Sequence, residues 1–379
     1  MMARKRVERC ISYDDTRQCY YVTLDAGKDP DGLRQRRWVT SPNLAQARRV
    51  LREFEAQRAS EPRVKPTSLT LGQWLDKWMT EVVAPNRAFT TVYGYRNMIR
   101  NDIDPMLGSV PLQKLTPRDI QGYYTHLRED RGLAPYTVRR YHDLLGNALR
   151  LAVKQDLLTR SPIERVEAPY VPPREAKFYA CEDLLALYRA AEGTWLETIV
   201  KLAGSLGLRR EEICGLRWEH VDFKARRIFI CEARAAAGAQ VVQKETKNRS
   251  STRTLYMTDE MRGVLRRERD RQRALYARLK KESCGFVTVD AQGQPQSPNV
   301  VSMAFKRFLA ANRLPHITLH GLRHTFATLA SAQGAPLFEI GKAMGHSTPS
   351  TTGKIYTHLQ DQTHVSTLAK VEEALREKG

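Results

Sequence analysis

The sequence predicts a multidomain, mainly α protein in three parts: a small β-sheet-plus-helix domain (1–65), a four-helix domain (67–165) and a mixed α+β domain (175–379). The first observation is length, because 379 residues are too many for one ordinary domain. The second is that apolar residues recur at helical spacing over most of the chain. The third is a pair of proline-containing segments, 61–68 and 161–174, which read as linkers.

The composition points to a polyanionic partner. The formal net charge is +20 and the pI is about 9.8, and a globular protein this basic usually binds nucleic acid. A generally cationic surface is the alternative. The 6 cysteines show no metal-ligand spacing and resemble reduced thiols of an intracellular protein. Without a long apolar run or a hydrophobic leader, we expect a cytoplasmic protein and no membrane partner.

Residues 1–65 predict two strands, 17–24 and 34–40, followed by a helix with Ser41 as its cap and Pro42 at its first position. The second strand carries three arginines, Arg34, Arg36 and Arg37. A strand with this pattern can lie in a DNA major groove. A sheet with a solvated basic edge is an equally good interpretation.

Residues 67–165 predict four helices with apolar inner faces. The clearest start is Thr116-Pro117-x-Asp119, a capping box with proline at the first helical position. The outer faces of the second and fourth helices carry basic residues, Arg96, Arg100, Arg139 and Arg140. These side chains are candidates for DNA contacts, although a charged bundle face is usually just solvated.

The last part, 175–379, is helix-rich with one sheet-like insertion. Segments 227–232, 240–245 and 253–257 alternate or are β-branched, and the polar stretch 246–252 separates the last two. Lys247 lies in that polar stretch, from which an ammonium group can reach into a site.

Two short motifs in this part place basic side chains on helices. Arg209 follows a glycine break at a helix start, and Glu212 lies three residues on, within reach of its guanidinium. His320 and Arg323 share one face of an apolar-patterned helix. A guanidinium beside an imidazole suits a phosphate oxyanion.

Together with Lys247, His346 and Tyr356, these residues supply what phosphoryl transfer without a metal needs. The arginines offset the transition-state charge, a tyrosine can act as nucleophile, and a lysine can protonate the departing alkoxide. No Walker-type loop, aspartate cluster or G-x-S-x-G segment is present. We therefore expect no metal and no cofactor.

The chain resembles the tyrosine recombinase, or phage integrase, family. The resemblance rests on Gly-Leu-Arg-x-x-Glu at 207–212, Thr-Lys at 246–247, Leu-His-Gly-Leu-Arg-His-Thr at 319–325, Met-Gly-His-Ser at 344–347 and Ile-Tyr-Thr-His at 355–358. It implies that Arg209 and Arg323 clamp the phosphate, Lys247 is the general acid and Tyr356 the nucleophile. It implies hydrogen-bonding roles for His320 and His346. Lys244 is a nearby alternative to Lys247.

The resemblance also implies an architecture and partners. The first part resembles a three-stranded arm-site DNA-binding domain, which places a further strand near 4–12. The second resembles the core-binding domain, which clamps duplex DNA together with the catalytic domain. The tail, 362–378, either docks on a neighbouring protomer or folds back. The expected partners are double-stranded DNA at core and arm sites, three further copies in a tetramer, an excisionase and a DNA-bending accessory protein.

Several alternatives stay open from the sequence. The nearest enzyme of another kind is a type IB topoisomerase, which shares the chemistry but lacks a comparable amino-terminal domain. A DNA-binding protein with a decayed site is a second. Among recombinases, a chromosome-dimer resolvase is a third, and the choice between a phage and a conjugative transposon is open. The remaining histidines have no assigned role, and His324 is placed off the face of His320 and Arg323.

Overall fold

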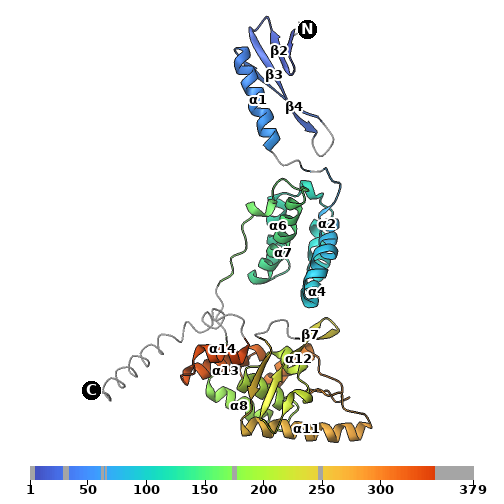
Figure 1. Ribbon diagram of the computed structural model, residues 1–379, viewed down its shortest axis with the longest axis vertical. Coiled ribbons are helices and arrows are strands. Elements are labelled where there is room, and N and C mark those ends of the chain that lie inside the picture. Colours follow the sequence, from blue (N-terminus) through green and yellow to red (C-terminus); the bar gives the residue numbers. More distant parts are fainter. Residues whose placement is uncertain are drawn as a thin grey trace, which may run out of the picture. The chain divides into compact units, whose positions relative to one another are not determined.

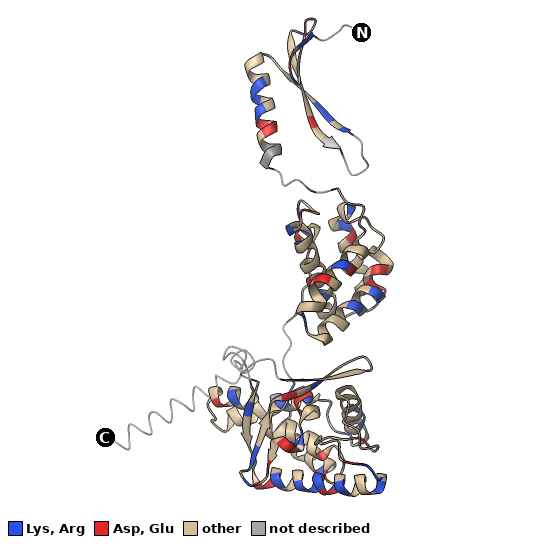
Figure 2. Cartoon of the chain, turned by 45° about the vertical axis from the view of Figure 1, so that its right-hand side comes forward, with Lys and Arg blue, Asp and Glu red and all other residues tan. Residues whose placement is uncertain are grey.

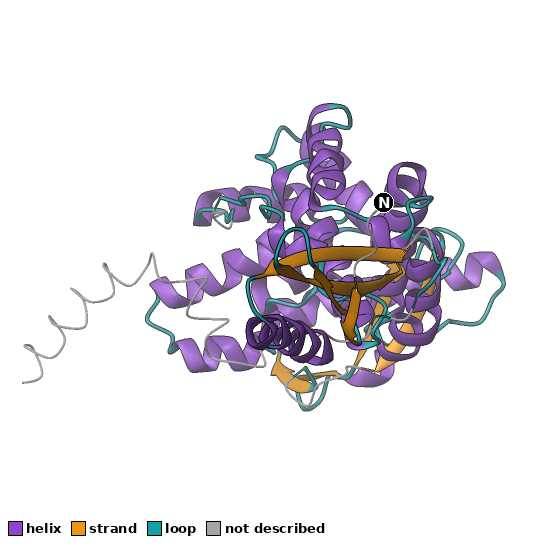
Figure 3. Cartoon of the chain, turned by 90° about the horizontal axis from the view of Figure 1, so that it is seen from above, coloured by secondary structure: helices purple, strands orange, loops and turns teal. Residues whose placement is uncertain are grey.

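The computed structural model describes residues 5–28, 34–60, 64, 66–172, 177–245 and 251–345. The chain divides into two compact units, Met1–Pro172 and Pro173–Gly379 (Figure 1). Helices are the main element, as the mainly α prediction requires (Figure 3). No described helix combines the length and apolar character needed to cross a membrane.

The amino-terminal part is an antiparallel sheet in the order β1-β2-β3-β4 with helix α1 against it. Its elements are β1 (Lys5–Glu8), β2 (Ile11–Asp14), β3 (Cys19–Lys28), β4 (Arg34–Ser41) and α1 (Leu44–Ser60). The strand expected near 4–12 is present, but it is split into the β1–β2 hairpin, which makes the sheet four-stranded. The turn between them places Cys10 at φ 63.

The start of α1 corrects one prediction. Ser41 is the last residue of β4 and is buried, so it does not cap the helix. The carboxamide oxygen of Asn43 accepts a hydrogen bond from the Gln46 amide at 2.8 Å, and the helix begins at Leu44. Asparagine and serine are both common capping residues. Because β4 extends through Ser41, the helix starts later and Asn43 is the cap.

The helical part has its own apolar core and follows the predicted helices closely. The capping box at Thr116 is present, because its hydroxyl accepts from the Asp119 amide while the Asp119 carboxylate accepts from the Thr116 amide. The Trp74 indole donates to the Ala148 carbonyl at 3.1 Å, which joins the first and last helices. The elements are α2 (Leu71–Trp78), a π-helical turn (Met79–Val83), α3 (Ala84–Asn86), α4 (Phe89–Met98), a second π-helical turn (Ile99–Ile103), α5 (Asp104–Leu107), α6 (Pro117–Glu129) and α7 (Pro135–Lys154), with short 3-10 turns at Leu112–Lys114 and Pro162–Arg165.

The second unit packs its helices around one large core, in which α13 lies along α9. Its helices are α8 (Cys181–Ala191), α9 (Glu197–Leu206), α10 (Arg210–Gly215), α11 (Asp259–Leu279), α12 (Pro298–Ala311), α13 (Leu319–Ala332) and α14 (Leu337–Met344), with a 3-10 turn at Trp218–His220. Basic residues occur in each described part of the chain and are dense along α11, where acidic residues are interspersed (Figure 2).

The sheet-like insertion forms two separate sheets. Strands β5 (Val221–Asp222), β6 (Arg227–Ile230) and β9 (Arg253–Tyr256) pair in the order β5-β6-β9. Strands β7 (Glu232–Ala237) and β8 (Gln240–Glu245) form a hairpin that packs on α10. The predicted segment 227–232 is therefore divided between β6 and β7, and the alanine-rich continuation of β7 was not predicted.

Candidate active site

Arg209 stands at the amino-terminal end of α10, where the chain changes direction. Gly207 ends α9 at φ 66, a left-handed conformation that favours glycine, and the ring of Phe326 occupies the place of a Cβ. The Arg209 amide donates to Glu212 at 2.8 Å, and its Nη1 donates to the same carboxylate at 2.7 Å. The side chain of Arg209 is 34% exposed, so a held guanidinium remains accessible to a ligand.

Glu212 is the buried anchor of this arrangement, as the sequence motif suggests. Its side chain is only 3% exposed. Burial raises the pKa of the carboxyl group, but hydrogen bonds and charge from Arg253, together with Arg209, outweigh burial and lower it. Glu212 is therefore an anion at neutral pH, and its negative charge fixes the direction of Arg209.

The first turns of α13 present His320 and Arg323. Thr318 caps the helix by accepting from the Gly321 amide at 3.0 Å. Arg323 is 1% exposed, and it donates to the Gly207 carbonyl at 2.6 Å and to the Met344 carbonyl at 2.7 Å. It thus joins the ends of α9 and α14 beneath the site.

His320 is a neutral imidazole beside these cations. Burial lowers its pKa, and the charges of Arg323 and Arg209 lower it further. A neutral ring offers one N–H donor and one acceptor, which suits hydrogen bonding to a phosphate oxygen or relay of a proton.

His324 belongs to the same cluster, which corrects the prediction that it lies off this face. Its ring meets that of His320 edge to face, with centroids 4.6 Å apart. The two residues are four positions apart on one helix, a spacing that places side chains together. Burial, His320 and Arg323 lower the pKa of His324 to about 4.

Three predicted site residues, Lys247, His346 and Tyr356, lie outside the described residues. Described residues close in sequence to His346 and to Lys247 form contacts at the site. Arg209 Nη2 donates to the Gly345 carbonyl at 2.8 Å, so the residue before His346 is at the clamp. Lys244, the alternative to Lys247, forms an ion pair with Glu211 at 3.6 Å.

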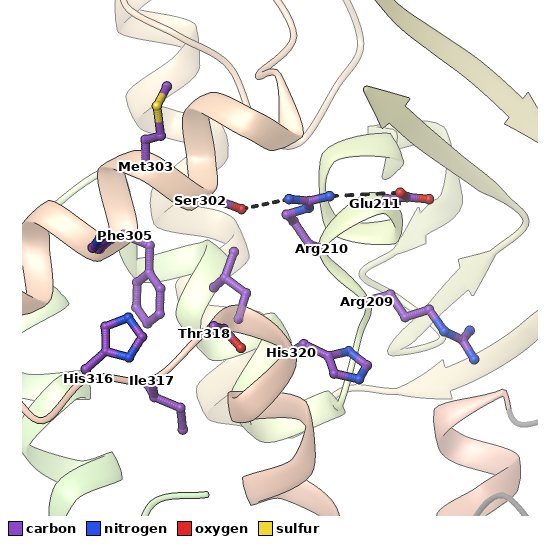
Figure 4. A pocket seen from close by; sticks show the side chains of 12 residues that line it. Arg209, Arg210, Glu211, Ser302, Met303, Phe305, His316, Ile317, Thr318 and His320 are labelled. Atoms are coloured by element: carbon purple, nitrogen blue, oxygen red, sulfur yellow. Dashed lines mark hydrogen bonds and ion pairs between the residues drawn. The ribbon is translucent and has the colours of Figure 1, made fainter. Parts of the chain in front are cut away.

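A cleft of about 750 Å³ opens beside Arg209 and His320 (Figure 4). Arg210 crosses it and donates to the Ser302 hydroxyl at 2.9 Å. Lys306 and His316 line it as well, so a histidine without a predicted role is at the site. The cations Arg209, Arg210 and Lys306 lie beside an apolar wall that includes Phe305 and Ile317, so the cleft places positive charge next to a hydrophobic surface. Among the described residues, His, Cys, Asp and Glu form no group of three or more suited to a metal ion.

The three predicted DNA-contact arginines of β4 lie on different faces of the amino-terminal sheet. Asp25 pairs with Arg36 in the β3–β4 register, and Leu24 pairs with Arg37. Because residues opposite each other share a face, Arg36 and Arg34 lie on one face and Arg37 on the face of the buried Leu24. Arg34 also forms an ion pair with Asp25 at 2.7 Å.

The four arginines of the helical part are all exposed: Arg96, Arg100, Arg139 and Arg140. Arg139 pairs with Asp143 at 3.3 Å, and Arg100 donates to the Asn101 side chain at 3.3 Å. These weak surface contacts leave the guanidinium groups accessible to solvent.

Comparison with family models matches residues 178–363 to the phage integrase family and residues 70–128 to the phage integrase N-terminal SAM-like domain. The chain belongs to the phage integrase family. It is a tyrosine recombinase, which is an enzyme of site-specific DNA recombination.

Relatives of this recombinase match over most of its length. A tyrosine recombinase XerC-like protein of Caldanaerobacter subterraneus subsp. tengcongensis is 25% identical over 90% of this chain and 93% of its own. The ICEBs1 integrase of Bacillus subtilis is 24% identical, again over 90% of this chain and 93% of its own.

Solved structures share the fold. The Tn1549 transposon integrase in complex with a circular intermediate DNA superposes with a TM-score of 0.65 at 21% identity, over 79% of this chain and 100% of the other. A lambda integrase tetramer bound to a Holliday junction superposes with a TM-score of 0.58 at 19% identity, over 93% of this chain and 96% of the other. These likenesses confirm the predicted multidomain, mainly α architecture.

Proposed function

We propose that this recombinase cuts one DNA strand with Tyr356, forming a 3′-phosphotyrosine and a free 5′-hydroxyl, and that strand exchange proceeds through a Holliday junction. The observation that supports this most is Arg209, held by Glu212 and Gly345 yet accessible beside neutral His320. A guanidinium oriented in advance stabilises a phosphate transition state without having to reorganise.

The charge of the described network suits that transition state. Arg209, Arg253 and Arg323 are cations and Glu212 is an anion, which leaves two net positive charges. A pentacoordinate phosphodiester transition state carries about two negative charges, so the network can stabilise it without a metal ion. Arg209 and Arg323 form the clamp in this proposal, and His320 and His346 donate hydrogen bonds.

Lys247 is the proposed general acid that protonates the departing 5′-oxygen. The ion pair between Lys244 and Glu211 of α10 supports this choice, because Lys244, the alternative general acid, already has an acidic partner there. In the reverse step, the 5′-hydroxyl of the exchanged strand returns its proton to Lys247 and attacks the phosphotyrosine, and Tyr356 leaves as its aryl oxide.

The rest of the chain binds and arranges DNA in the same proposal. Residues 67–165 and residues 175–379 both bind the core site, and residues 1–65 bind arm sites. Four protomers act together, with an excisionase and a DNA-bending protein as accessory partners. The solved relatives support this, since one is a tetramer on a Holliday junction and another is bound to circular intermediate DNA.

The test begins with the DNA next to the coding region, where an attachment repeat is expected. A nicked duplex carrying that repeat should trap a covalent protein–DNA complex that survives denaturing electrophoresis. Tyr356→Phe should bind the duplex and trap none. Covalent DNA on Tyr356→Phe would contradict the proposal. Efficient relaxation of plasmids lacking the repeat would favour a topoisomerase instead.

A further inference from the structure

Arg253, the first residue of β9, is a buried cation that the sequence motifs do not include. Its side chain is 6% exposed. Nη1 and Nη2 donate to the two oxygens of Glu212 at 3.0 and 2.9 Å, and Nε donates to the Ala343 carbonyl at 2.6 Å. A buried guanidinium with this many partners is held in a single orientation.

The contact with Ala343 is one of three on successive carbonyls. Arg253 binds the Ala343 carbonyl at 2.6 Å, Arg323 that of Met344 at 2.7 Å, and Arg209 that of Gly345 at 2.8 Å. The last carbonyls of a helix lack partners within the helix, and they carry the negative end of its dipole. The carboxyl end of α14 therefore gathers three arginines from three separate segments.

Glu212 connects Arg253 to the clamp. Its Oε1 accepts from Arg209 Nη1 at 2.7 Å and from Arg253 Nη1 at 3.0 Å. Its Oε2 accepts from the Arg209 amide at 2.8 Å and from Arg253 Nη2 at 2.9 Å. Both oxygens are shared in the same way, so the carboxylate cannot turn without breaking a bond to each arginine.

We infer that Arg253 is a positioning residue for the phosphate clamp. It orients Glu212 and offsets its negative charge, so that Arg209 faces the DNA phosphate with its positive charge undiminished. Arg253 itself does not touch the phosphate. The inference rests on the proposed function, in which Arg209 binds the scissile phosphate.

The test measures single-turnover cleavage of the nicked attachment-repeat duplex at saturating protein. Arg253→Met should lower the rate constant about 100-fold. Glu212 then has Arg209 as its remaining guanidinium partner, so its negative charge offsets the positive charge that Arg209 presents to the phosphate. The Kd for the duplex should change less than about threefold, since most affinity comes from phosphates elsewhere. Arg253→Lys should fall between, because one ammonium group cannot span both Glu212 oxygens and the Ala343 carbonyl.

The decisive variant is Glu212→Gln combined with Arg253→Met. Removing the anion together with the cation restores two net positive charges at the clamp and leaves no unpaired buried charge. Cleavage should therefore be about tenfold faster than with Arg253→Met alone. If Arg253→Met does not fold, the double variant is compared with the unmodified protein instead. Its cleavage rate constant should then be about tenfold lower than that of the unmodified protein.

Arg271→Met is the matched control. Arg271 binds the buried carboxylate of Glu268 with two hydrogen bonds, at 2.8 and 2.6 Å, in α11 of the same unit. Its cleavage rate should stay within about twofold of the unmodified protein. The inference is overturned if the double variant is no faster than Arg253→Met, if Arg271→Met is equally slow, or if duplex affinity falls while the rate does not. Absence of cleavage by the unmodified protein would instead refute the proposed function.

Discussion

The amino-terminal ends of α10 and α13 each supply one arginine to the site, but they hold it differently. Arg209 on α10 is 34% exposed and bound by the carboxylate of Glu212. Arg323 on α13 is 1% exposed and donates to the backbone carbonyls of Gly207 and Met344. Arg209 is thus oriented by a negative charge, whereas Arg323 is oriented by the dipoles of backbone carbonyl groups.

The difference separates two tasks that the family motif groups together. A carboxylate orients a guanidinium but cancels part of its field, so Arg209 needs Arg253 to restore the balance. Carbonyl dipoles orient a guanidinium and leave its net charge intact. Arg323 therefore acts as a source of positive potential and as a link between α9 and α14, whereas Arg209 is the accessible contact.

The largest effect is expected for Arg323→Lys. The shorter ammonium cannot reach both the Gly207 and Met344 carbonyls, and hydrogen bonds from a charged donor contribute about 1.5–3 kcal/mol each. The free energy of unfolding in urea should fall by about 3 kcal/mol, and the cleavage rate by about 1000-fold or more. Unchanged stability would show that Arg323 does not link the two helices.

A smaller and purely functional effect is expected for Arg209→Lys. Its half-exposed side chain contributes little to folding, so the free energy of unfolding should change by less than about 1 kcal/mol. Cleavage should still slow about 100-fold, because a lysine cannot bind Glu212, Gly345 and a phosphate oxygen together. If Arg209→Lys lowered the free energy of unfolding as much as Arg323→Lys does, the two arginines would not differ in their contribution to folding.

The effect that is smallest at neutral pH is expected for His324. The unfolded imidazole of His324 has a pKa of about 6.5, whereas in the folded protein the pKa is lowered to about 4. The unfolded state therefore binds more protons, and stability should fall as pH drops from about 6.5 to 4 and stay flat above that range. His324→Asn should flatten this slope in urea titrations at several pH values. Identical slopes would contradict the burial of a neutral ring beside His320 and Arg323.

Sequence patterns predicted the helical part well, because its information is local. Apolar spacing indicates the helices, and the capping box at Thr116 marks the start of α6. The start of α1 was wrong, since the choice between Ser41 and Asn43 depends on how far β4 pairs with β3. The end of β7 was missed, because alanine has little intrinsic preference for strands and this strand is held by its hairpin partner.

The site was predictable only where family motifs mark it. Arg209, Glu212, His320 and Arg323 come together as expected. Arg253 was not found, because its partners Glu212 and Ala343 are 41 and 90 positions away and no local pattern connects them. Helical spacing alone is enough to place His324 beside His320, and the structure brings the two rings into contact.

The gathering of three arginines at the end of α14 also determines when the clamp can form. Arg209 and Gly345 are 136 positions apart, and Arg323 and Gly207 are 116 apart. During synthesis, the preceding parts can fold before Gly345 has emerged from the ribosome. Each of the three arginines lacks one of its anchoring carbonyls until then, so the complete clamp forms only after α14 has been synthesised.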